Sequence, residues 1–214
     1  MSVNEVKRYD RGMWLLENYG LKRLRRLLLQ EVRGEVLEIG VGTGANLPFY
    51  DGAGERITAV DINPARLVGT MNHAQMVNGR HPFIVGCADA QQLPFADKQF
   101  DTVVSTLVFC SIPDPAAALA EVKRVLRPNG RFLLLEHVRG LNPITQRLTD
   151  WLHPAWFAMQ GSCHLNRETA VSVQAAGFHI VETSSHGWGV IQMIKAVPSE
   201  SRGLNTGIQI LSTA

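Results

Sequence analysis

The residues best suited to chemistry in this sequence are one carboxylate and three glycines that follow it. Glu38 ends a short apolar stretch, and Gly40, Gly42 and Gly44 come next at every second position. Glycines at this spacing let the backbone turn tightly and approach a ligand, because no Cβ stands in the way. The range 34–55 contains no lysine or arginine. A cationic ligand therefore suits this turn better than a pyrophosphate does.

A second interpretation of the same turn stays open on the residues alone. The pattern Gly40-x-Gly42-x-x-Ala45 satisfies the dinucleotide fingerprint, and Asp61 follows at roughly the 20-residue distance expected for a ribose contact. It predicts an NAD-dependent oxidoreductase, or a cofactor-binding protein without catalysis. The sequence offers no obvious pair of residues for hydride transfer.

The elements around the turn alternate between strand and helix patterns. Apolar segments rich in β-branched residues alternate with helical patterns that begin at Pro64 and Ala116. The first three strands each end in a carboxylate or a glycine turn. Because parallel strands share one carboxyl edge, these ends should lie together. The predicted fold class is α/β, a Rossmann-like doubly wound sheet with helices on both faces. The predicted strands span 36–39, 57–60, 83–88, 100–107 and 131–135.

The last third of the chain predicts a different ending. A helix over 167–176, with Asn166 as its N-cap, precedes strands at 179–185 and 190–196. Strands so close in sequence must be antiparallel, since a parallel crossover needs about a dozen residues. We therefore expect a single domain over 1–197, followed by a tail at 198–214 that is predicted to be disordered.

Two segments should cover the sheet. Residues 1–33 are predicted to be helical, with leucines on one side and a solvated basic side made of Lys22, Arg23, Arg25 and Arg26. They form a packed helix or a lid that could meet an acidic substrate or a membrane surface. The segment 140–165 breaks the alternation and is too apolar for a solvent loop. It is predicted to cap the carboxyl edge, and the residues expected to contact substrate are Trp14, Trp151 and Trp156.

The bulk properties narrow the classes of function. The 214 residues carry a net charge of +2, and three widely spaced cysteines predict neither a disulfide framework nor a metal site. No apolar run reaches the roughly 18 residues of a membrane span, so we expect a cytoplasmic protein. A broad basic surface and a base-flipping motif are both missing, which argues against nucleic acid as a partner. Peripheral membrane contact and oligomeric state stay open.

With its third glycine, the turn resembles the first motif of the class I S-adenosylmethionine-dependent methyltransferases, acidic-x-Gly-x-Gly-x-Gly. The resemblance covers about residues 34–196. It implies S-adenosylmethionine as cofactor, with the first motif at its methionine end, Asp61 at the ribose, and Asp89 with Ala90 at the adenine. The full set of implied cofactor residues is Glu38, Gly40, Gly42, Gly44, Asn46, Asp61, Ile62, Asp89, Ala90, Thr106 and Leu107.

Four further stretches are similar to the methyltransferase-like alkyl thiol methyltransferases of animals: 105–112, 136–138, 153–156 and 161–168. This resemblance favours S-methylation of a small thiol, although those relatives tend to have Asp where this chain has His153. The alternatives are N-methylation of a phospholipid or amine, and O-methylation of an apolar or aromatic small molecule.

Methyl transfer from a sulfonium is an in-line displacement that requires no metal. A thiol with a pKa near 8.5 needs only a weak base to reach its thiolate, and histidine titrates close to neutrality. His137, after the fifth strand, and His164, in the cap, are the candidate bases. A structural role is the favoured interpretation for each of them.

Overall fold

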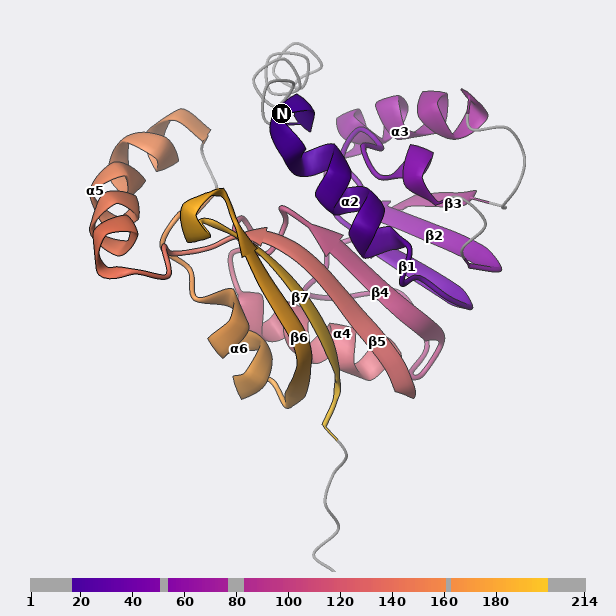
Figure 1. The fold of residues 1–214 in the computed structure, drawn as a ribbon. Helices are drawn as coiled ribbons and strands as arrows, with labels where there is room; N and C mark the ends of the chain where they lie inside the picture. The colour runs from indigo at the N-terminus through magenta and orange to yellow at the C-terminus, as the bar shows by residue number, and fades with distance from the viewer. Residues whose placement is uncertain (1–16, 51–53, 77–82, 161–162, 200–214) are drawn as a thin grey trace, which may run out of the picture.

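In a computed structural model, residues 17–50, 54–76, 83–160 and 163–199 are described. They contain a seven-stranded sheet with the order β3-β2-β1-β4-β5-β7-β6 (Figure 1). The first five strands pair in parallel, and β7 lies antiparallel between β5 and β6. The predicted α/β fold with its C-terminal hairpin is confirmed. The strands are β1 Glu35–Ile39, β2 Arg56–Asp61, β3 Phe83–Cys87, β4 Phe100–Thr106, β5 Leu126–His137, β6 Phe178–His186 and β7 Ile191–Pro198.

Helices cover both faces of this sheet. One face carries α2 (Lys22–Leu29) and α3 (Pro64–Met76), and the other carries α4 (Pro115–Val125) and α6 (Thr169–Ala175). Side chains of a strand point alternately to the two faces. Accordingly Leu133 and Leu135 of β5 join the core beneath α2, whereas Phe132 and Leu134 join the core beneath α4. The two cores hold the strands in one register, so their carboxyl ends meet at one edge.

Several predicted boundaries were wrong. The residues after the glycine turn could open a helix, but they form only a 3-10 turn, η2 (Leu47–Phe49), with Pro48 in its first positions. The fourth strand stops at Thr106, because Leu107 has a positive φ of 59°. The residue before α6 is Glu168 rather than Asn166, and its side chain makes no capping hydrogen bond.

The predicted basic side of the N-terminal helix was also wrong in one respect. Within α2, Leu24, Arg25, Leu28 and Leu29 are buried, whereas Leu27 is 41% exposed. Arg25 lies on the line of Leu21 and Leu28, four residues after one and three before the other, which is the same helix face. Helical spacing alone would have predicted that Arg25 is buried. The exposed position was predicted because the side chain is charged.

The cap contains a long helix, α5 (Pro143–Gln160), that stands beside the carboxyl edge of the sheet (Figure 1). Strand β7 includes Pro198, and residues 200–214 of the predicted tail lie outside the described residues, as does Trp14. None of the helices in the described ranges is sufficiently long and apolar to cross a bilayer.

Candidate functional site

The glycine turn lies at the carboxyl end of β1, beside β2 and β4. Gly40, Gly42 and Gly44 have positive φ values of 68°, 60° and 91°, a region that only glycine adopts readily. A Cβ on Gly40 would collide with the side chain of Val108, whereas one on Gly42 would meet open space. The turn is thus closed on its inner side and open at Gly42, where a ligand could approach the backbone.

Beneath the turn, Glu38 is a buried carboxylate with both oxygens occupied. Its Oε1 accepts a hydrogen bond from Asn46 Nδ2 at 2.9 Å, and its Oε2 accepts one from the Tyr50 hydroxyl at 2.8 Å. Burial raises the pKa of Glu38, while these two hydrogen bonds and the charge of Arg25 oppose the rise. Each oxygen retains acceptor capacity for a further donor. The sequence analysis missed Tyr50.

Arg25 connects this carboxylate to the N-terminal helix. Its Nη1 donates to Asn46 Oδ1 at 2.8 Å and to Thr106 Oγ1 at 2.6 Å, and its Nη2 pairs with Glu17 at 2.9 Å. Asn46 Nδ2 also donates to Thr106 Oγ1 at 3.0 Å. Three predicted cofactor residues therefore share one buried hydrogen-bond network with an arginine that the sequence analysis placed in solvent.

Asp61 supports the turn from the next strand. Its Oδ2 accepts from the backbone N–H of Gly42 at 2.9 Å, and its Oδ1 accepts from that of Asn63 at 2.8 Å. Ile62 follows with its side chain 63% exposed. The backbone oxygen of Asp61 accepts from Ala88 at 3.2 Å, which places β2 beside the loop that carries the remaining predicted residues, Asp89 and Ala90.

A second buried carboxylate fixes the loop after β4. Glu136 accepts from the backbone N–H groups of Val108, Phe109 and Cys110 at 3.0–3.3 Å, and from the Ser105 hydroxyl at 3.2 Å. Burial raises the pKa of Glu136, and these donors oppose the rise. The loop beside Leu107 is therefore held at a fixed position by a carboxylate that points into the fold.

The two histidines predicted as bases each contact side chains of the cap. The Nδ1 of His137 lies 4.0 Å from Cys163 Sγ, and its ring centroid is 6.0 Å from that of Trp156. The ring of His164 stacks at 5.2 Å on His153 and lies 4.8 Å from Phe157. Trp151, by contrast, is 76% exposed on the outer side of α5. The fold thus brings three of the predicted side chains, His137, His164 and Trp156, to the same side of the cap as three that were not predicted, Cys163, His153 and Phe157.

Cys163 lies beside the thiol of Cys110 and the rings of His137 and Trp156. Its pKa is lowered, first by a hydrogen bond from Cys110 and then by His137 and Trp156, against the effect of burial. Cys110 is fully buried, and its own pKa is raised well above the usual value by its bond to Cys163 and by burial. The half-buried sulfur of Cys163 is therefore the one that ionises. Burial and the nearby Arg167 lower the pKa of His164, which favours its neutral form.

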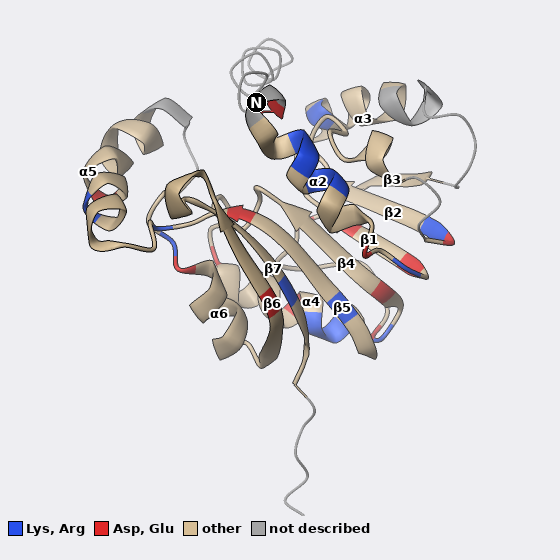
Figure 2. Ribbon diagram, viewed as in Figure 1, with Lys and Arg blue, Asp and Glu red and all other residues tan. Residues whose placement is uncertain are grey.

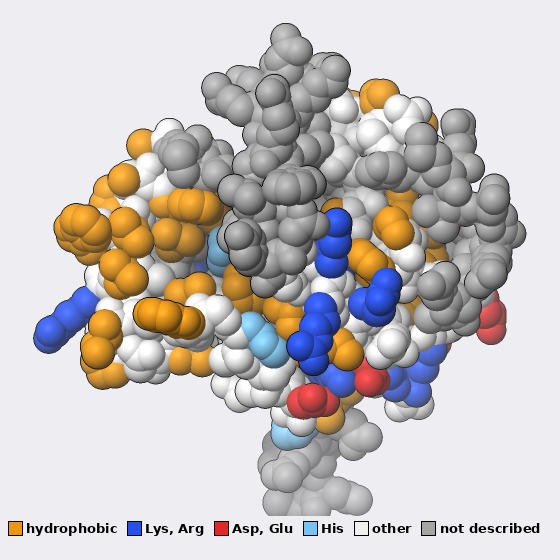
Figure 3. Space-filling model, turned by 45° about the horizontal axis from the view of Figure 1, so that its top comes forward, with side chains coloured by type: hydrophobic (Ala, Val, Ile, Leu, Met, Phe, Trp, Pro, Cys, Tyr) orange, Lys and Arg blue, Asp and Glu red, His pale blue; other side chains and the backbone are white. Residues whose placement is uncertain are grey.

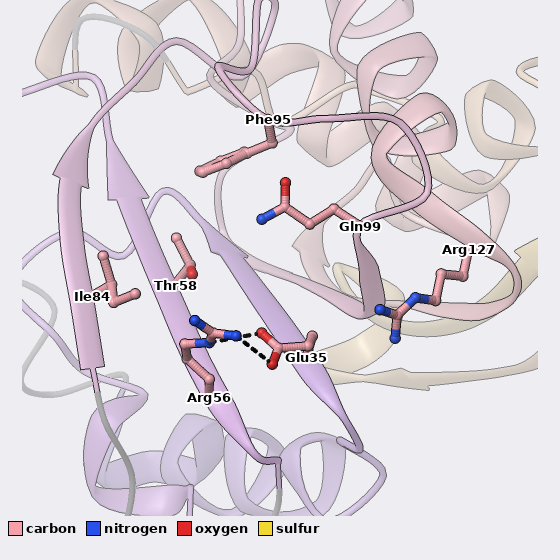
Figure 4. A pocket seen from close by; sticks show the side chains of 7 residues that line it. All are labelled: Glu35, Arg56, Thr58, Ile84, Phe95, Gln99 and Arg127. Carbon is pink, nitrogen blue, oxygen red and sulfur yellow. Dashed lines mark hydrogen bonds and ion pairs between the residues drawn. The ribbon is translucent and has the colours of Figure 1, made fainter.

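A separate hollow of about 300 Å³ lies away from these groups (Figure 4). Glu35 and Arg56, at the starts of β1 and β2, form an ion pair of 2.9 Å across it. It lies toward the opposite edge of the sheet, and none of the predicted site residues lines it. The hollow therefore belongs to the scaffold rather than to the carboxyl-edge site.

The chemistry of the carboxyl edge fits a cationic nucleoside ligand. Glu38 offers a buried carboxylate, Asp61 offers a second one with lone pairs to spare, and Ile62 offers an exposed apolar surface beside it. The open backbone at Gly42 lies between the two carboxylates in the chain. These features fit S-adenosylmethionine, the cofactor that the sequence resemblance implies.

Comparisons with known proteins agree with the geometry. A family model described as a methyltransferase domain matches residues 37–134. A thiol S-methyltransferase of Rattus norvegicus is 38% identical over 154 residues, covering 69% of this chain and 61% of the relative. A thiol S-methyltransferase of Homo sapiens is 33% identical over 179 residues, covering 77% of this chain and 71% of the relative. The chain thus spans under two thirds of the rat relative and somewhat more of the human one.

Solved structures share the architecture. A S-adenosylmethionine-dependent methyltransferase from Aquifex aeolicus superposes with a TM-score of 0.65, covering 92% of this chain and 99% of that one. At 16% identity this likeness supports the fold alone.

Proposed function

Since this chain belongs to the family of S-adenosylmethionine-dependent methyltransferases, we propose that it methylates the sulfur of a small apolar thiol. The observation that carries the proposal is the similarity to thiol S-methyltransferases over about three quarters of the chain. The cap supports it, because an imidazole is a sufficient base for a thiol and would be a poor one for an aliphatic alcohol.

In this proposal the edge residues hold the cofactor by complementary charge. Glu38 accepts from the ammonium of the methionine end, and Asp61 accepts from the ribose hydroxyls. Asp89, Ala90 and Ile62 bound the adenine. S-adenosylmethionine supplies a methyl group already activated by its sulfonium, so the chain needs no metal for this step.

The remaining task of the chain is to align and deprotonate the acceptor. His137 is the last residue of β5, at the same edge as Thr106, and its ring lies beside Cys163 and Trp156. We assign the proton of the acceptor thiol to His137, with neutral His164 as the second acceptor of protons in the cap. The aromatic inner side of α5 excludes water, which favours displacement at the aligned sulfur.

The test is a methyl-transfer screen with the purified chain and S-adenosylmethionine. Small alkyl and aryl thiols, phenols, amines and phosphatidylethanolamine vesicles are compared by release of S-adenosylhomocysteine. Turnover on thiols that exceeds all other classes supports the proposal. Turnover on amines or the lipid alone would replace it with N-methylation, and turnover on phenols alone would replace it with O-methylation.

Two variants separate the cofactor site from the acceptor site. Asp61→Asn should weaken the binding of S-adenosylhomocysteine. Binding is measured by thermal stabilisation, because a ligand that binds only the folded state raises its stability. NAD should not stabilise the wild-type chain. His137→Ala should keep S-adenosylhomocysteine affinity and lose turnover at pH 7. An Asp61→Asn chain with unchanged affinity would refute the ribose assignment.

A further inference from the structure

Two thiols meet where the cap segment passes the loop after β4. The backbone N–H of His164 donates to the carbonyl of Cys110 at 2.8 Å, so Cys163, the preceding residue, lies beside Cys110. A hydrogen bond also joins the two thiols. Arg167 holds the same two segments together further along, since its guanidinium donates to the carbonyl of Phe109. Cys110 and Cys163 are therefore adjacent in space, although they are far apart in the sequence.

The segments on both sides of this pair are held in place. On the loop, the backbone N–H of Cys110 donates to Glu136 at 3.3 Å. On the cap, Arg139 pairs with Asp150 of α5 at 2.7 Å and with Glu168 at 3.2 Å, and Figure 2 shows charged residues of both signs on the segments that connect α5 to the rest of the fold. Backbones joined by a hydrogen bond lie roughly 5 Å apart. A disulfide needs a Cα separation of about 4.4–6.8 Å, so the two cysteines can be bridged with little movement of either segment.

The two thiols differ in exposure and in ionisation. Cys110 is 2% exposed, whereas Cys163 is half-buried. The hydrogen bond from Cys110 and the neighbouring rings of His137, 4.0 Å from the sulfur, and Trp156 lower the pKa of Cys163 to about 4. Cys163 is therefore a thiolate at neutral pH, which is the reactive form of a cysteine. Figure 3 shows histidine side chains that reach the surface beside the hydrophobic residues over α5, where a small polar solute can approach them.

We propose that Cys163 and Cys110 form a site of oxidation by peroxides, in which Cys163 is oxidised first and Cys110 then closes a disulfide. The Cys163 thiolate attacks the terminal oxygen of the peroxide and the O–O bond breaks. The products are a sulfenic acid and a hydroxide or alkoxide, which solvent protonates. The Cys110 sulfur then attacks the Cys163 sulfur: the S–S bond forms, the S–O bond breaks, and hydroxide leaves with the Cys110 proton as water. Two electrons pass from the thiols to the peroxide, so no other reactant is needed.

Oxidation of Cys163 also makes Cys110 easier to ionise. In the reduced pair, the hydrogen bond to Cys163, burial and the charges of Glu136 and Cys163 raise the pKa of Cys110 well above its usual value. A sulfenic acid is neutral, so the negative charge beside Cys110 disappears and its pKa falls. The accessible sulfur thus meets the oxidant, and the buried sulfur reacts only afterwards. The reaction uses only the two thiols and the peroxide, so it does not depend on which acceptor is methylated.

The test is mass spectrometry of the whole chain after treatment with hydrogen peroxide at pH 7, with dimedone present to trap sulfenic acid. Free thiols are then blocked with iodoacetamide in urea, and the digested peptides are measured. Wild type should give a peptide pair linked through Cys110 and Cys163. Cys110→Ser should give no link and at least about a tenfold larger dimedone adduct on Cys163, because the resolving thiol is missing. Cys87→Ser is the matched control and should form the link as wild type does, since the exposed Cys87 lies outside the pair.

Three results would overturn the proposal. The first is a wild-type chain that keeps both thiols free after peroxide, or that links Cys163 to Cys87 or to a second chain instead. The second is an equal dimedone adduct on Cys163 in wild type and in Cys110→Ser, which would show that Cys110 does not react with the sulfenic acid. The third is an equal yield of the Cys110–Cys163 link when wild type is oxidised in urea, because the link would then not depend on the folded geometry.

Discussion

The buried network around Glu38, which we call the floor of the carboxyl edge, and the inner side of the cap differ in how their buried polar groups are hydrogen-bonded. Around Glu38, the side chains of Asn46, Tyr50, Thr106 and Arg25 satisfy one another through short hydrogen bonds. At the inner side of α5, His153 Nδ1 is buried without a hydrogen-bond partner among the described residues, and Trp156 Nε1 has no partner there other than the nearby sulfur of Cys163. The side chains of the floor satisfy one another's hydrogen bonds, whereas the cap contains buried polar atoms that lack a hydrogen-bond partner.

The difference indicates which region contributes to the stability of the fold and which to selectivity for the acceptor. A fully satisfied buried network rigidifies its site, so this part of the carboxyl edge is organised before any ligand arrives. Unsatisfied buried groups destabilise the fold and are retained where a ligand completes them. We infer that substitutions in the floor act on folding and cofactor affinity, whereas those in the cap act on the acceptor with little effect on folding.

The largest effect is expected for Glu38→Ala. The substitution leaves the buried donors of Asn46 and Tyr50 unpaired and removes the carboxylate near Arg25, which should lower the free energy of unfolding by about 3–5 kcal/mol. Urea denaturation at pH 7 measures this loss. Glu35→Ala on the same strand is the control, since its exposed ion pair with Arg56 contributes about 0–1 kcal/mol. Equal losses in the two variants would contradict the comparison.

The next effect is expected for Arg25→Met. This change keeps the length of the side chain but removes donors to Asn46, Thr106 and Glu17, and should cost about 2–3 kcal/mol of unfolding free energy. Calorimetry should also show weaker S-adenosylhomocysteine binding. Arg23→Met, exposed on the same helix, should stay within about 0.5 kcal/mol of wild type. If Arg25→Met matches that control, the arginine does not belong to the floor.

A change of rate, not of stability, is expected at Cys163. Its lowered pKa means that the thiolate persists as pH falls below the ordinary thiol range, so iodoacetamide should alkylate Cys163 at pH 7 about tenfold faster than exposed Cys87. Mass spectrometry of the modified peptides reads both sites in one sample. His137→Ala should slow the reaction at Cys163 alone. Similar rates at both cysteines in wild type would remove Cys163 from the cap chemistry.

The smallest effect is expected for His153→Phe. Replacing an unpaired buried nitrogen with a ring of similar shape should leave the free energy of unfolding unchanged or raise it by about 1 kcal/mol. The same variant should raise KM for the acceptor more than KM for S-adenosylmethionine. A loss of stability comparable to that of Arg25→Met would show that the cap is as closely built as the floor.

The carboxyl edge itself could be predicted from sequence. Glu38, the alternate glycines and Asp61 stand at strand ends that a period-two apolar pattern locates, and positive φ at the glycines is a local requirement of the turn. The order of βα units and the antiparallel hairpin follow from loop lengths in the same way. These features depend on residues close together in the chain, so the sequence alone determined them.

Only the tertiary structure decided the contacts between distant segments. Arg25 is buried because Asn46 and Thr106 lie opposite it, 21 and 81 residues away in sequence. Cys163 meets His137 across 26 residues, and the loop 108–110 is fixed by Glu136. The apolar side of α5 likewise faces solvent because the fold takes its threonines inward. Helical periodicity fixes which residues share a face of a helix, but packing decides which face is turned toward the protein.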